Sequence, residues 1–96
     1  MIETVGKESL PEIFCDLNAG ATLGTFRLTN GSFEDLDKIG LTVDAAVGKR
    51  FLFNGGDDTD EDGMLADVCF VGTIINDPTF GYLAKVAESG IFWRRK

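Results

Sequence analysis

The first apolar pattern along the chain has the period of an α-helix. Four residues share one face at intervals of three and four positions, namely Leu10, Ile13, Phe14 and Leu17. Ser9 stands before them as an N-cap residue with Glu12 three positions later, and Gly20 can take the left-handed conformation that ends a helix. The pattern therefore predicts an amphipathic helix over residues 9–17.

The next stretch changes from strand-like to helical patterning. Residues 21–29 contain threonines and Phe26 at spacings that suit a pleated strand, and Asn30-Gly31 favours a turn. Ser32 then offers an N-cap for a short helix that Gly40 ends, and Thr42 can cap a further helical turn over residues 43–47. The middle of the chain predicts one strand followed by one or two short helices.

The C-terminal half alternates apolar and polar positions with turn signals between the runs. Four strands are predicted over residues 50–53, 65–76, 82–88 and 91–94, with Ser89-Gly90 as the tight connection between the last two. Gly72 in the middle of the longest strand indicates a bend or bulge. Together with the strand at residues 21–29, these form an α+β fold. We expect a strongly bent antiparallel sheet, or a barrel of SH3-like size, of about five strands with one or two short helices.

Length and composition define the class of protein. The chain of 96 residues fits one domain, residues 1–96, and its eight phenylalanines and one tryptophan supply a core. No apolar run approaches the length that crosses a membrane, and no basic segment with a following apolar stretch marks a secretory signal. Two cysteines without metal-binding spacing, Cys15 and Cys69, are read as reduced thiols. We therefore expect a cytoplasmic protein without membrane contact.

The negative charge is concentrated in one short segment. The chain has nine basic and sixteen acidic residues, and five of the acids lie within six positions: Asp57, Asp58, Asp60, Glu61 and Asp62. The basic cluster Arg94-Arg95-Lys96 is interpreted as a solvated end, so direct nucleic-acid binding is disfavoured. The chain lacks histidine, which removes the commonest general base and the commonest zinc ligand. An enzyme is not expected, although one with unidentified carboxylate chemistry stays an alternative.

The same acidic segment partly matches a calcium-binding loop. Asp58, Asp60 and Asp62 alternate and are followed by Gly63, as in the first half of an EF-hand loop. The twelfth position, which should be a bidentate glutamate, is Cys69, so an EF-hand is rejected. A weaker calcium site that joins Asp58, Asp60, Asp62 and Asp67 is the alternative use of this loop.

These observations favour a non-catalytic, acidic protein-interaction module of the inhibitor or immunity type. Its acidic segment, residues 57–62, would contact a basic surface on a partner protein, because complementary charge speeds and selects association. Trp93 beside Arg94 is a second candidate partner contact, with packing beneath the N-terminal helix as its alternative role. Open strand edges would also allow a homodimer.

Overall fold

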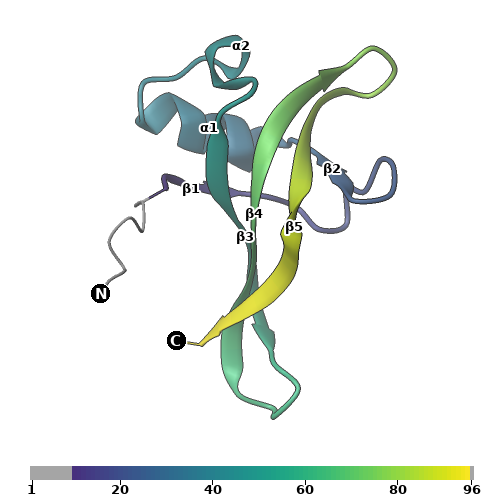
Figure 1. Ribbon diagram of the computed structural model, residues 1–96. Coiled ribbons are helices and arrows are strands. Elements are labelled where there is room, and N and C mark those ends of the chain that lie inside the picture. The colour runs from purple at the N-terminus through teal and green to yellow at the C-terminus, as the bar shows by residue number, and fades with distance from the viewer. Residues whose placement is uncertain (1–9, 96) are drawn as a thin grey trace, which may run out of the picture.

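The computed structural model describes residues 10–95, which form an α+β fold (Figure 1). A five-stranded sheet in the order β1-β3-β4-β5-β2 curls into a half-barrel with two short helices at one end. The elements in chain order are β1 (Glu12–Phe14), β2 (Thr25–Arg27), α1 (Asn30–Lys38), α2 (Val43–Ala46), β3 (Arg50–Thr59), β4 (Leu65–Asp77) and β5 (Gly81–Arg95). The fold class predicted from the sequence is confirmed.

The helix predicted over residues 9–17 is wrong, because its centre forms strand β1. β1 runs parallel to β3 with Ile13 opposite Phe53, which makes the sheet mixed. The Leu52 N–H donates to the Pro11 carbonyl and the Cys15 N–H donates to the Asn54 carbonyl, both at 3.0 Å. These interstrand bonds satisfy the backbone and bury Ile13, so tertiary pairing outweighs the local helical pattern. The proposed cap Ser9 lies outside the described residues.

The predicted helix at residues 32–39 is confirmed, but it begins earlier than its sequence signal. Thr29 is the N-cap of α1, and Asn30-Gly31 forms the first turn of the helix in place of a hairpin turn. The buried Ser32 hydroxyl accepts from the Thr29 N–H at 3.1 Å and donates to the Phe14 carbonyl at 2.7 Å. This one side chain therefore closes the helix start and ties α1 to β1.

The second predicted helical turn is also confirmed. The Thr42 hydroxyl accepts a hydrogen bond from the Ala45 N–H at 3.2 Å at the start of α2. By contrast, the strand predicted over residues 21–29 shortens to Thr25–Arg27, because residues 22–25 close a turn through the Thr25 N–H and the Thr22 carbonyl.

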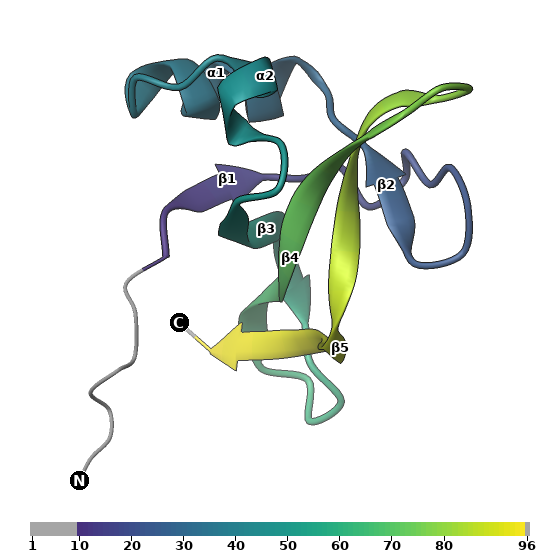
Figure 2. The same ribbon diagram turned by 45° about the horizontal axis from the view of Figure 1, so that its top comes forward.

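Three long strands replace the four short ones predicted for the C-terminal half. β5 is one strand, and Ser89-Gly90 belongs to a wide bulge in which residues 87–90 face the single residue Val71 of β4. Both halves of β5 pair with β4, and the strand bends sharply between them (Figure 2). The bend predicted at Gly72 is confirmed, since the register shifts there and a Cβ atom at Gly72 would lie 2.3 Å from the Lys85 carbonyl oxygen.

The core lies between the helices and the adjacent half of the sheet. Phe53 and Phe70 stack with ring centroids 5.0 Å apart, and Phe26 and Phe51 adjoin them at 5.7 and 6.0 Å. Phe51, Phe53 and Phe70 are all fully buried. Over residues 10–95, neither helix has the length and apolar character needed to cross a membrane.

Candidate functional site

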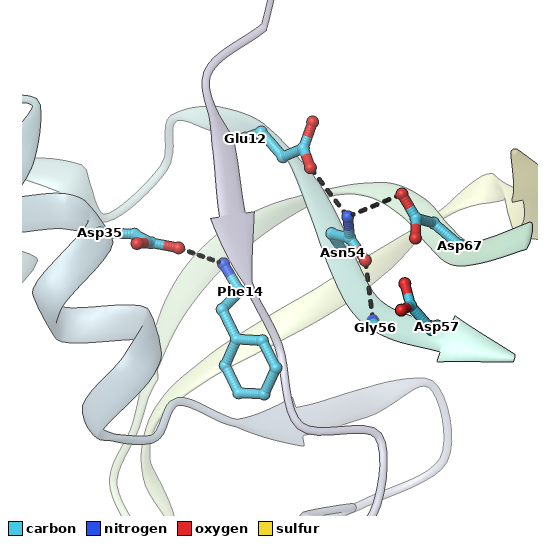
Figure 3. Close-up of a pocket in the computed structure, with 7 residues that line it drawn as sticks. All are labelled: Glu12, Phe14, Asp35, Asn54, Gly56, Asp57 and Asp67. Carbon is cyan, nitrogen blue, oxygen red and sulfur yellow. Dashed lines mark hydrogen bonds between the residues drawn. The ribbon is translucent and has the colours of Figure 1, made fainter. Parts of the chain in front are cut away.

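An acidic pocket of about 360 Å³ opens between α1, β1 and the β3–β4 hairpin (Figure 3). Its lining comes from four elements that are distant in the sequence. The residues are Glu12 and Phe14 of β1, Asp35 of α1, Asn54, Gly56 and Asp57 of β3, and Asp67 of β4. Four of these seven residues carry carboxylates, so the pocket has an acidic lining.

Asn54 organises one wall of the pocket. Its side-chain amide donates to Glu12 Oε2 at 2.8 Å and to Asp67 Oδ2 at 3.3 Å, and Figure 3 shows the amide between these two carboxylates. The Asn54 side-chain oxygen accepts from the Gly56 N–H at 2.7 Å, where the β3 register shifts. The asparagine therefore fixes both the carboxylates and the backbone kink beside them.

Arg94 from β5 completes this wall. Its guanidinium donates to both Glu12 oxygens at 2.9 and 3.0 Å and to Asp67 Oδ2 at 2.9 Å. The hydrogen bond from Arg94, followed by that from Asn54, holds the pKa of Glu12 below its ordinary value. A carboxyl with a lowered pKa is suited to remaining charged, whereas a general acid near neutral pH needs a raised one.

The opposite wall is set by the contact between α1 and β1. Asp35 Oδ2 accepts from the Phe14 N–H at 2.8 Å, which anchors the edge strand to the helix. The Lys38 ammonium lies 3.9 Å from the other Asp35 oxygen. Phe14 is 38% exposed, and an exposed aromatic residue next to carboxylates can contact a cation.

The acidic segment, residues 57–62, lies partly on a strand and partly in a turn. Asp57 and Asp58 lie on β3, while Asp60, Glu61 and Asp62 lie at the β3–β4 connection. Asp60 Oδ1 accepts from the N–H groups of Asp62 at 2.9 Å and of Met64 at 3.0 Å. The Asp60 side chain therefore stabilises the backbone of the hairpin connection.

Arg95 forms ion pairs with two carboxylates of the β3–β4 connection, as Arg94 does with two carboxylates of the pocket. Its guanidinium donates to Asp60 Oδ2 and Asp62 Oδ2, each at 2.6 Å. The Arg95 hydrogen bond, together with the backbone bond from Met64, lowers the pKa of Asp60. The interpretation of the C-terminal arginines as a solvated end is wrong for Arg94 and Arg95, and Lys96 lies outside the described residues.

The four predicted calcium ligands are not gathered around one point. Asp58 accepts from the Thr59 N–H at 2.8 Å, Asp60 and Asp62 are paired with Arg95, and Asp67 is paired with Arg94. Within residues 10–95, no three acidic, histidine or cysteine side chains are grouped so that they could hold a metal ion. Calcium in this loop stays a prediction, and it would have to compete with both arginines.

Trp93 lies on β5 opposite Val68 and is 42% exposed. It does not pack beneath an N-terminal helix, since the residues of that predicted helix form β1. Ile91 and Phe92 are also exposed, so a short apolar segment precedes the two arginines. Alternation along the strand places Trp93 and Arg94 on opposite faces, and Trp93 therefore presents a surface separate from the pocket.

Both cysteines are free and fully buried. Cys15 belongs to the core, where burial raises the pKa of its thiol to about 12, and burial also raises the pKa of Cys69. A buried thiol with a raised pKa has little of the thiolate that reacts, so neither residue is arranged for nucleophilic chemistry.

Comparisons with known proteins add no information on function, so a function has to be argued from the geometry of the structure. A scan against protein-family models, a search of curated proteins and a search of solved structures each found no match. Sequence reasoning singled out Asp57 and Asp67 but missed Glu12, Phe14, Asp35 and Asn54 as pocket residues. Glu12, Asp35 and Asn54 carry only the local signal of polarity, and Phe14 carries none. The parallel β1–β3 pairing, which brings Glu12 and Phe14 to the pocket, is not visible in the pattern.

Proposed function

We propose that the protein is a non-catalytic interaction module whose acidic face contacts a basic surface on a partner protein. The acidic face comprises the pocket and the β3–β4 hairpin turn. The main observation in support is that Asp57 belongs both to the acidic segment and to the pocket lining, so the two acidic features are continuous. This joins carboxylates from β1, α1, β3 and β4 into one negative surface.

The charges on this face support binding better than catalysis. Glu12 and Asp67 are held in fixed positions by Arg94 and Asn54, and rigid charged groups contribute to recognition without a large ordering cost. Asp58 and Glu61 are exposed on the hairpin, where they would act on the approach of a charged partner. A guanidinium or ammonium group of the partner would enter the pocket beside Phe14.

The test uses a hexa-arginine peptide as a defined basic probe, with binding followed by NMR of backbone amides. Shifts are expected to concentrate at Glu12, Phe14, Asn54 and residues 56–62. The double variant D57N/E61Q should weaken binding several-fold, because it removes two exposed charges, one from the pocket lining and one from the hairpin turn. Affinity should also fall steeply with added salt.

The matched control is E34Q/D37N, which removes the same charge from exposed positions of α1. It should leave binding close to that of the wild type. Equal weakening by both double variants would mean that only net charge matters and would overturn the proposed face. Shifts confined to other surfaces would do the same.

A further inference from the structure

A second cavity, of about 340 Å³, lies on the sheet at the β5 bulge and has a charge opposite to that of the acidic face. Its lining comes from three neighbouring strands: Arg50 of β3, Gly72 and Thr73 of β4, and Lys85, Val86, Ala87 and Glu88 of β5. Two cations and one carboxylate therefore line it, in a chain whose formal net charge is −7. None of its residues lines the acidic pocket.

The register of the sheet brings the two cations onto one face. Arg50 lies directly opposite Thr73, and Thr73 lies directly opposite Lys85, so the three side chains form a row across β3, β4 and β5. Arg50 and Lys85 are then two strand spacings apart, about 10 Å between backbones. Their long side chains can reach an anion between them, above the Thr73 hydroxyl.

The bulge explains why there is a hollow at this place. Residues 87–90 have no partner residue in register on β4, so β5 leaves the regular ladder next to Lys85 and Val86. A Cβ atom at Gly72 would lie 2.3 Å from the Lys85 carbonyl oxygen, so β4 and β5 approach closely next to the bulge. The cavity therefore follows from the same irregularity that bends the sheet.

Arg50 and Lys85 also differ from the arginines at the end of β5. Arg94 and Arg95 are each paired with two carboxylates, whereas among residues 10–95 neither Arg50 nor Lys85 has an ion pair with a carboxylate. Both are exposed and able to bind an external group. Arginine and lysine flanking a hydroxyl are the donors that recognise phosphate oxygens.

We infer that the cavity at the β5 bulge binds a phosphate group through Arg50, Lys85 and the Thr73 hydroxyl. Glu88 lines the same cavity and opposes the anion, so it limits the affinity. The site shares no residue with the acidic pocket, so either proposal can be wrong without affecting the other. It would give the protein a second, oppositely charged binding surface.

The test is an NMR titration with inorganic phosphate, and in parallel with glycerol phosphate, at constant ionic strength. Saturable shifts are expected at Thr73, Lys85 and Ala87 for whichever form of phosphate the site accepts. R50Q/K85Q should weaken binding at least tenfold, and T73V should weaken it several-fold. E88Q should strengthen binding, because it removes the opposing carboxylate.

The control variant K38Q removes an exposed cation that lies outside the cavity, on α1, and should leave the titration unchanged. The opposite effects of R50Q/K85Q and E88Q cannot come from loss of folding. The inference is overturned if phosphate and glycerol phosphate both give no saturable shift at the cavity. It is also overturned if acetate gives an equal response or if K38Q weakens binding as much as R50Q/K85Q.

Discussion

The two ends of the sheet use the same three long strands but are stabilised by different forces. At the helix-covered end, the core cluster draws on Ile13, Leu36, Phe53 and Phe70, among others, and its members are buried apolar residues. At the hairpin end, which projects away from the helices in Figure 1, Arg94 and Arg95 connect β5 to four carboxylates.

This difference separates the part of the molecule that supplies most of its stability from the part that carries its charged groups. Full burial of a phenylalanine side chain contributes about 1.5–3 kcal/mol and involves no charge that salt could screen or pH could change. Partly exposed ion pairs contribute much less and are screened. The helix-covered end therefore supplies most of the stability of the fold. Little of that stability depends on the residues of the hairpin end, which are thus available for the partner contact proposed above.

The largest effect is expected from the substitution F70A at the helix-covered end. Phe70 is fully buried and stacks on Phe53, so its removal should lower the free energy of unfolding by about 3–5 kcal/mol. Chemical denaturation followed by circular dichroism measures this change. F80A, at a half-exposed turn residue, is the control and should cost less than about 1 kcal/mol.

The junction between the two ends should respond less strongly. A methyl group at Gly72 meets the Lys85 carbonyl, so G72A should force the strands apart and cost about 1–3 kcal/mol. G20A is the matched control, because a Cβ atom there has no neighbour within 4 Å. Equal denaturation midpoints for the two variants would show that β4 and β5 are not tightly apposed at the bulge.

The smallest effect is expected at the hairpin end and should appear only in acid. The folded pKa of Asp60 lies below its ordinary value of 3.8, so its contribution is complete above that pH and is lost as the pH falls through the folded pKa. The wild type should therefore lose stability below about pH 4 more steeply than D60N does.

A double-mutant cycle isolates the ion pair at the hairpin end. D60N keeps an oxygen for the Asp62 and Met64 N–H groups while it removes the charge that faces Arg95. R95Q should flatten the acid dependence of the melting temperature to a similar extent, and the double variant should add little. Fully additive effects would show that Asp60 and Arg95 do not interact across the hairpin.

Prediction from the sequence succeeded where a local pattern and the tertiary environment agree. The α2 cap at Thr42, the long strand around Phe70 and the bend at Gly72 were all visible in the chain. The pattern failed at β1, where helical spacing of Ile13 and Phe14 competes with a parallel partner 40 residues away. It also misplaced the connection at Ser89-Gly90, because turn residues suit a bulge as well as a hairpin.

The candidate site shows the same division. The acidic segment at residues 57–62 could be read directly, but its pairing with Arg95 could not, since this arginine lies more than 30 residues away.

The sequence by itself determined the α+β composition, the aromatic core and the concentration of negative charge, because these follow from residue type and local period. Only the tertiary structure decided that β1 is a strand, that the pocket joins four elements, and that Arg50 and Lys85 face one cavity. The physical reason is that strand register is set by contacts between distant segments, and register determines which side chains share a face.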